Sequence, residues 1–298
     1  MKKILLSSLV ASLIITGCVA KEATPKDANI EKINTTAIKN AKEEVNKHKV
    51  KLVQEAVDSL VYANEALVAL EKGDKNKASK ALEKALGKLE VTLASKNVPE
   101  LLPVDNIITI DEFIGSSKTI KDIVKHAKEL LDEDRVQAAK EVLKPLKSEI
   151  GITVVNLPLG TYPDALKKTA KLIHENKVDK AKVVLTTALN TLVEVNTIIP
   201  IPLATATDLI AAASDIAETD SDKAKAYLDA AQEELKKAKY LGYVSKSDVS
   251  YKALDDAIDA LKLDITSNKV KSMFTNLKEK ITNFTSKIFS SKDEAKNK

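Results

Sequence analysis

The chain has few of the residues that usually carry chemistry. Its 298 residues include no tryptophan, one cysteine, three histidines and only seven glycines. A single cysteine excludes a disulfide within one chain. The sequence also lacks a GxSxG elbow, a P-loop and a GxGxxG loop. We therefore expect no catalytic residues, no cofactor and no enzymatic activity.

An excess of positive charge is missing as well. Lysine and arginine total 47 against 43 aspartates and glutamates, and Arg135 is the only arginine. A protein that binds nucleic acid needs a concentrated basic face, usually one with arginine. The composition therefore excludes nucleic acid as a partner.

The sequence also lacks metal ligands at a useful spacing. The three histidines are His48, His126 and His174, and none belongs to a zinc motif such as HExxH. The acidic groups at 132–134 and 255–259 lack the glycine and the terminal glutamate of a calcium loop. We interpret both groups as solvated helix ends and predict no metal site.

The N-terminus has the pattern of an export signal. Two lysines precede an apolar run that is too short to span a membrane. The run ends in Ile15-Thr16-Gly17-Cys18, which resembles the bacterial lipobox and so implies cleavage before Cys18 and lipidation of its thiol with palmitate or a similar chain. The alternative is an ordinary signal peptide with a chance cysteine.

A lipidated Cys18 would determine the location of the protein. Several acyl chains on one residue anchor a protein stably, whereas a single chain binds only marginally. By the rule for bacterial lipoproteins, the absence of Asp after the cysteine favours the outer membrane over the inner. We expect a periplasmic lipoprotein with a signal peptide at 1–17 and a flexible spacer at 18–36.

Few glycines and prolines, with abundant Ala, Leu, Lys and Glu, are typical of an all-α protein. The clearest element is a helical hairpin at 158–202. Thr161 and Asp164 are spaced as in a capping box and begin an amphipathic helix. The polar run 174–177 interrupts this helix, and a second one follows until the prolines near position 200 end it.

Three other segments repeat this hairpin in variant form. An apolar residue is followed by an alanine eight positions later and by a leucine four beyond that. The four sets are Leu70/Ala78/Leu82, Leu131/Ala139/Leu143, Ile173/Ala181/Leu185 and Ile216/Ala224/Leu228. The small alanine lets the returning helix approach closely, and the leucine fills the interface. We predict stacked antiparallel helical hairpins in one domain at 37–265.

Two β-branched runs, 107–110 and 152–155, are bounded by turn residues. They flank one of the helical hairpins. The fold class is therefore all-α, and it could include a small two-stranded β-ribbon made by pairing these runs.

The last hairpin contains a group of tyrosines that could contact a ligand or partner. They are Tyr227, Tyr240, Tyr243 and Tyr251. These residues could line a small-molecule pocket, although tyrosines at helical spacing more often belong to a core or its rim.

The segment 266–298 is a lysine-rich amphipathic tail. Its apolar residues step by three and four to form a narrow seam: Phe274, Leu277, Ile281, Phe284 and Ile288. Such a helix could lie on an anionic membrane or dock on a partner or second subunit. The narrow stripe favours docking or self-association, and the remaining alternative is a disordered appendage.

Residues 47–265 resemble the YfdX family of bacterial envelope proteins. The resemblance rests on the segment around Tyr162-Pro163-Asp164, the proline junction at 199–203, the helix at 230–241 and Leu241-Gly242-Tyr243. It implies a mostly helical, oligomeric periplasmic protein that is linked to stress responses and is chaperone-like rather than catalytic. The lipobox and the lysine-rich tail depart from the family.

Two functions follow from these observations. The first is a non-enzymatic envelope lipoprotein whose helical scaffold binds unfolded or envelope proteins, as a stress-related holdase that forms a homo-oligomer. The alternative is a small-molecule-binding module that uses the tyrosines of the last hairpin. An exposed apolar groove would favour the first, and a closed pocket with convergent polar groups the second.

Overall fold

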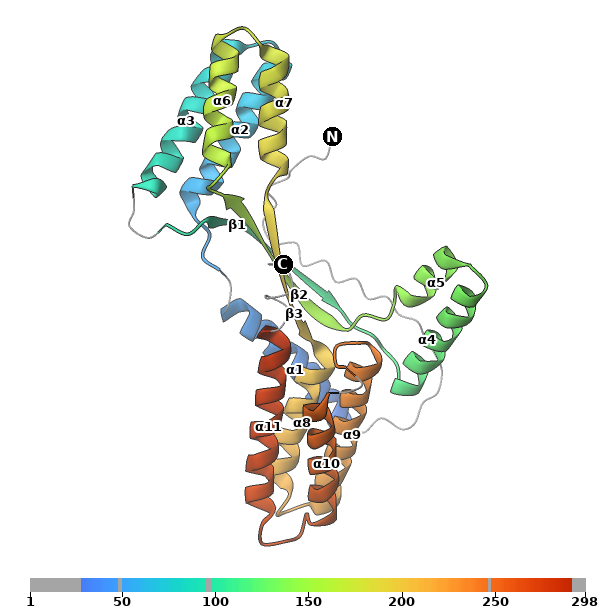
Figure 1. Cartoon of the computed structure of the whole chain (residues 1–298). Coiled ribbons are helices and arrows are strands. Elements are labelled where there is room, and N and C mark those ends of the chain that lie inside the picture. Colours follow the sequence, from blue (N-terminus) through green and yellow to red (C-terminus); the bar gives the residue numbers. More distant parts are fainter. Residues whose placement is uncertain (1–27, 48–49, 95–97, 246–247, 291–298) are drawn as a thin grey trace. The chain divides into compact units, whose positions relative to one another are not determined.

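The computed structural model describes residues 28–47, 50–94, 98–245 and 248–290 (Figure 1). Within these residues the chain forms eleven helices and a three-stranded antiparallel sheet. The helices are α1 (Ala28–Lys47), α2 (Gln54–Glu71), α3 (Lys75–Leu93), α4 (Ser117–Asp132), α5 (Val136–Leu143), α6 (Tyr162–His174), α7 (Val178–Asn190), α8 (Ile201–Ile216), α9 (Ser221–Tyr240), α10 (Val249–Leu263) and α11 (Val270–Ser290). The strands are β1 (Leu101–Asp111), β2 (Glu149–Pro158) and β3 (Val193–Pro200). The predicted helical fold is confirmed, and no helix in the described part of the chain combines the length and apolarity that a membrane span requires.

The chain divides into two compact units, each assembled from separate stretches. Unit 1 contains the described parts of 1–47, 108–151 and 197–298, and unit 2 contains those of 48–107 and 152–196. This differs from the single domain predicted at 37–265. Hydrophobic periodicity reveals helices, but it does not reveal which helices share a core.

Unit 2 is built on two helical hairpins, α2–α3 and α6–α7. The hairpins contact each other through α2 and α7 and through α3 and α6. The repeated pattern of an apolar residue, an alanine and a leucine is called the hairpin template below. Its alanines Ala78 and Ala181 are fully buried, as are the leucines four residues later, Leu82 and Leu185. These positions confirm the predicted register of both hairpins.

Three of the hairpin turns share the same backbone conformation and hydrogen bond. The residue five positions before the template alanine has a positive φ: 77° at Gly73, 59° at Asp134 and 60° at Asn176. The N–H of the next residue donates to the carbonyl five residues earlier, at 2.8 to 2.9 Å. This is the left-handed helix ending that glycine and asparagine favour, and it makes the turn short enough for the alanine to meet the preceding helix.

The α6–α7 hairpin differs from its prediction at both ends. Thr161 occupies the N-cap position of α6, but its side chain makes no capping hydrogen bond, so the predicted capping box is wrong. Helix α7 ends at Asn190 and strand β3 follows it, while Pro202 stands in the first turn of α8. The run Val193–Pro200 is rich in β-branched residues, and this preference overrides the helical continuation.

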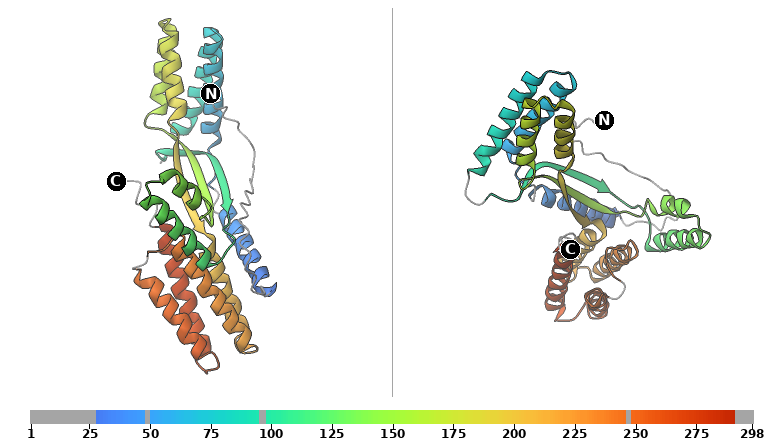
Figure 2. Two further views of the ribbon diagram at one scale, coloured as in Figure 1. Left: turned by 90° about the vertical axis from the view of Figure 1, so that its right-hand side faces the viewer. Right: turned by 45° about the horizontal axis from the view of Figure 1, so that its top comes forward.

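Five of the helices of unit 1, which are α1, α8, α9, α10 and α11, share one core. Figure 2 shows the course of these helices from two further sides. Helix α1 packs against α8, burying Ala37 and Ala41, and Asn40 donates to Asp208 at 2.9 Å. The predicted spacer at 18–36 is therefore helical from Ala28 onward. Helix α1 has few apolar residues at helical spacing, and α8 supplies the surface on which α1 packs.

The hairpin α4–α5 belongs to unit 1 but buries little of its own surface. Ala139 is 1% exposed, as the template predicts, whereas Leu131 and Leu143 are 45% and 38% exposed. The prediction that the template leucines fill an interface is therefore wrong for this hairpin. Its core consists of Ala127, Leu130 and Ala139, and its described packing against the rest of unit 1 is mainly that of α4 on α9.

The sheet has the strand order β1-β2-β3. The predicted ribbon corresponds to the β1–β2 pair and is confirmed, and β3 adds a third strand. Each strand has residues in both units, so the chain passes between the units once along every strand.

Candidate functional site

An open groove lies between α6 and α7 in unit 2. Its volume is about 420 Å³. The walls are largely apolar and include Ala165 on α6 and Val183 and Ala188 on α7, while Asp164 and Lys168 stand among the lining residues of α6. Val183 is 65% exposed, so the groove is open to solvent.

The sequence explains why the two helices leave space here. Ala181, near the turn, lets α6 and α7 approach closely at one end. The opposite end is lined by alanine at 165 and 188 rather than by the leucines that fill the core. Short side chains on facing helices leave a channel that longer ones would close.

Tyr162 lines the end of the groove at the start of α6 and is only 1% exposed. Burial raises the pKa of Tyr162 well above its ordinary value, which the nearby Ser59 hydroxyl only partly offsets. Within the described residues, neither hydroxyl has a hydrogen bond of good geometry. A buried hydroxyl without a partner costs free energy, so this pair is a weak point beneath the groove.

The groove has few titratable lining residues. Its titratable lining residues are Asp164, Lys168 and the buried phenol of Tyr162. Lys167 holds Asp164 at 4.0 Å, and both side chains are largely exposed. Apolar walls with a few charged residues at the rim match an apolar side chain on a helix or extended segment.

The four predicted tyrosines lie in unit 1 and do not line this groove. Tyr227 and Tyr251 are 5% and 6% exposed and belong to the core, and burial raises the pKa of Tyr251 to about 12. Tyr240 is half-buried, and the ammonium of Lys121 lies 4.7 Å from its ring centroid. The hydroxyl of Tyr243 accepts from the main-chain N–H of Ser148 at 3.0 Å.

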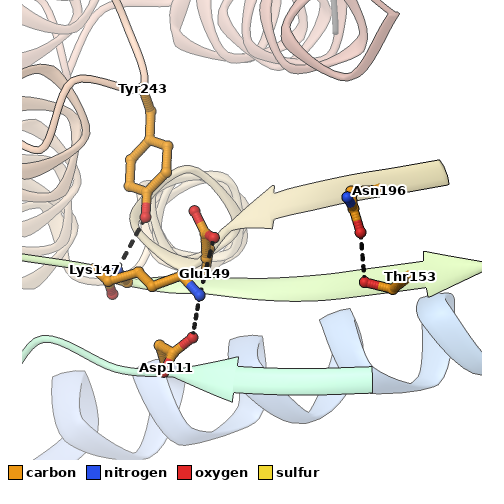
Figure 3. A network of polar contacts seen from close by, with 7 residues as sticks. Asp111, Lys147, Glu149, Thr153, Asn196 and Tyr243 are labelled. Carbon is orange, nitrogen blue, oxygen red and sulfur yellow. Dashed lines mark hydrogen bonds and ion pairs between the residues drawn. The ribbon is translucent and has the colours of Figure 1, made fainter. Parts of the chain in front are cut away.

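Tyr243 belongs to a polar network around the start of β2 (Figure 3). Lys147 lies 2.5 Å from a carboxylate oxygen of Asp111 and 3.4 Å from one of Glu149. Burial by itself lowers the pKa of Lys147, but the two carboxylates outweigh it and the pKa is raised. For the phenol of Tyr243 the effect of burial has the opposite sign, and burial raises its pKa. The groups satisfy one another, so the network connects elements of unit 1 rather than presenting free groups to a substrate.

The predicted association seam is covered by the chain itself. Phe274, Leu277, Ile281 and Phe284 are only 1% to 2% exposed, and α11 packs against α8 and α10. The surface expected to meet a second subunit or a membrane is therefore part of the core of unit 1. Ile288 lies in α11, but its side chain is outside the described residues.

The remaining predicted sites are the lipidated cysteine, the histidines and the acidic groups. Cys18, the signal peptide and His48 lie outside the described residues. Within the described part of the chain, no group of three or more His, Cys, Asp or Glu is arranged to hold a metal. The group at 255–259 is not a solvated helix end as predicted, because Asp255 and Asp259 lie in the middle of α10 and both accept from the side-chain amide of Gln232 at 2.9 Å.

A comparison with protein families supports the resemblance noted in the sequence. Residues 60–198 match the model of the family described as YfdX protein. A solved structure of YfdX from Salmonella Typhi is 17% identical; the match covers 50% of this chain and 93% of that chain, with a TM-score of 0.35. No curated protein matches the chain.

Proposed function

Because residues 60–198 match the YfdX family model, we propose that the chain is a non-enzymatic, protein-binding scaffold of the cell envelope with a stress-related holdase role. The observation that supports this proposal is the open apolar groove between α6 and α7, which lies inside the matched residues. A holdase needs an apolar surface that stays accessible in its own folded state, and the exposed surface of this groove is largely apolar.

The groove would act by taking up single apolar side chains of an unfolded client. A leucine that leaves water here would contribute about 1.5–3 kcal/mol. One such contact corresponds to binding in the millimolar range or weaker, because micromolar binding requires about 8 kcal/mol. Binding would therefore be reversible unless several contacts combine, which suits a protein that holds clients without trapping them.

The proposal also includes the cellular location of the protein. A lipid on Cys18 would tether the scaffold to the periplasmic face of the envelope, with the outer membrane favoured. Replacing Cys18 with Ser should block both lipidation and cleavage at the lipobox, which mass spectrometry of the protein from the membrane fraction would detect. Normal acylation of that variant would contradict the assignment.

A homo-oligomer is also part of the proposal. Four residues of the α11 seam are already buried within unit 1, so self-association would have to use another surface. Sedimentation of the mature protein measures whether it forms an oligomer. The same measurement after deletion of 291–298 tests that segment as the contact, because an unchanged mass of the oligomer would exclude it.

The test of the groove compares two exposed valines of unit 2. Val183 lines the groove and is 65% exposed, whereas Val91 on α3 is 61% exposed and is not among the lining residues. Val183→Lys should weaken suppression of the aggregation of reduced insulin, measured by light scattering, and Val91→Lys should not. Equal effects of the two variants would show that general surface charge, and not the groove, is responsible.

The alternative function, a small molecule bound by the four tyrosines, has no specific observation in its favour. Two of these side chains are core residues of unit 1, and the other two are engaged by Lys121 and by the main chain of Ser148.

A further inference from the structure

Strand β3 has an open outer edge in unit 2. The strand order places β3 beside β2 alone, so within the described sheet its other side has no neighbouring strand. The four successive residues 193–196 are all exposed. Successive side chains of a strand point to opposite faces, so both faces of this stretch are uncovered.

The other edge of the sheet in unit 2 is protected. The N–H of Val53 donates to the carbonyl of Pro103 at 2.9 Å, and the side chain of Asn106 donates to the carbonyl of Val50 at 2.9 Å. Residues 50–53 therefore bond to β1. Pro103 and Asp105 are also residues that discourage the pairing of an edge with another chain.

No comparable segment bonds to the main chain at 193–196 among the described residues. A side chain of the neighbouring strand β2 does reach this stretch: the amide of Asn156 donates to the carbonyl of Val193 at 3.2 Å. In an edge strand every second residue directs its N–H and C=O away from the sheet. These outward-directed groups can pair with another extended chain.

The side chains beside this edge are suited to an apolar strand. The hydroxyl of Thr153 donates to the side-chain oxygen of Asn196 at 2.6 Å (Figure 3), so these two residues share one face. By alternation, the opposite face carries four β-branched aliphatic residues: Ile152, Val154, Val193 and Val195. Val193 and Val195 are 37% and 36% exposed. A strand added beyond β3 would extend this aliphatic face.

We propose that the outer edge at 193–196 binds an extended segment of a client polypeptide as an added β-strand, selected for apolar residues at alternate positions. Main-chain hydrogen bonds would supply affinity for many sequences, and the aliphatic face would supply the preference. The proposal deepens the holdase function, on which it rests, by naming the form of client that is held.

A second copy of the chain fits this edge less well than a client does. Glu194 is the only charged residue in the stretch 193–196. Antiparallel pairing of two copies centred on this stretch would bring two Glu194 side chains close together on one face, and like charges across paired strands are destabilising. A client segment with Thr or Lys at that position avoids this repulsion.

The test uses a defined probe peptide and the full mature chain. The probe is a fluorescein-labelled octapeptide of alternating Val and Thr with a lysine at each end. Its control has the same side chains but carries N-methyl groups on every second residue, which removes the hydrogen bonds along one edge. Fluorescence anisotropy should show roughly tenfold weaker binding of the methylated peptide, because two or so hydrogen bonds are lost.

Two protein variants locate the binding. Val195→Lys places a charge at the edge and should weaken binding of the unmethylated peptide to a similar degree. Val91→Lys, at an exposed position of α3 outside the α6–α7 groove, should leave this binding unchanged. Urea unfolding of Val195→Lys checks that the fold is kept, and the comparison of the two peptides needs no variant at all.

The outcomes separate this proposal from the proposed function. Equal binding of the two peptides, or no binding of either, overturns strand addition even if Val183→Lys still weakens aggregation suppression, in which case the groove function stands. Sensitivity to methylation without any effect of Val183→Lys on aggregation supports the edge and contradicts the groove. A dimer that Val195→Lys dissociates, with no peptide binding, assigns the edge to a second copy and overturns the client.

Discussion

The hairpins α6–α7 and α4–α5 carry the same sequence template and bury it differently. In both, the alanine after the turn is fully buried, with Ala181 0% and Ala139 1% exposed. The leucine that follows is 0% exposed at Leu185 and 38% exposed at Leu143. The first hairpin lies against a second hairpin, α2–α3, whereas the described packing of the other is mainly that of α4 on α9.

This contrast separates what a hairpin encodes locally from what its surroundings add. The left-handed turn residue and the alanine bring two helices together within a hairpin. The burial of the leucine depends on a further layer of helices, which the hairpin itself does not specify. A leucine at a template position is therefore evidence for a helix but not for a core.

The largest expected difference in stability between the two hairpins comes from replacing the template leucine of each with alanine. Leu185→Ala leaves a cavity in a packed core and should cost about 2–5 kcal/mol of unfolding free energy. Leu143→Ala removes a partly exposed side chain and should cost less than about 1 kcal/mol. Urea unfolding of the two variants checks this, and similar costs would mean that α4–α5 is packed in solution.

Enlarging the alanine tests the feature that the hairpins share. Ala181→Leu and Ala139→Leu should both overpack a close helix contact and cost about 1–3 kcal/mol each. The α4–α5 hairpin has more freedom to separate, so its cost should lie at the lower end. If either variant were as stable as the wild type in thermal melts, the close approach at the alanine would be disproved for that hairpin.

A smaller effect of opposite sign is expected beneath the groove. Tyr162→Phe removes a buried hydroxyl that has no well-aligned partner among the described residues, so it should stabilise unit 2 by about 1 kcal/mol. Thr169→Val serves as a control, because the Thr169 hydroxyl donates to the carbonyl of Ala165 at 2.8 Å and its loss should not stabilise. A destabilising Tyr162→Phe would show that the phenol is hydrogen-bonded.

The smallest effect is expected at the turn itself. Lys177 pairs with Glu175 at 2.7 Å, but the side chains are 53% and 36% exposed. Exposed ion pairs contribute little, so Lys177→Ala should change stability by no more than about 0.5 kcal/mol. A loss above about 1 kcal/mol in urea melts would indicate that the pair helps to hold the left-handed turn at Asn176.

Much of the fold follows from local patterns. The hairpins follow from apolar periodicity, and the pairing of β1 with β2 follows from two β-branched runs between turn residues. Strand β3 was missed because it follows α7 almost directly, with no glycine or proline between them. Gly73, Asp134 and Asn176 are a further indication in the sequence, since Gly, Asp and Asn tolerate a left-handed turn.

The candidate sites were less accessible to sequence reasoning. The α11 seam has the spacing of a docking helix, but spacing does not say whether the partner is another molecule or the same chain. The α6–α7 groove depends on how far apart two helices lie where alanines face each other. The edge at 193–196 is an edge because β3 has no neighbouring strand on its outer side in the described sheet, and the strand order reveals this.

The interleaved composition of the two units has a consequence for the order in which the chain can fold. During synthesis from the N-terminus, α1 appears first, yet the helices that it shares a core with begin at Ile201. Unit 2 can close once residue 196 has appeared, whereas unit 1 must wait for α11 near the end of the chain. Closing such long loops slows folding and leaves apolar helices exposed in the meantime. A nascent chain that stops after β3 would hold all the segments of unit 2 while α1 still lacked its partners.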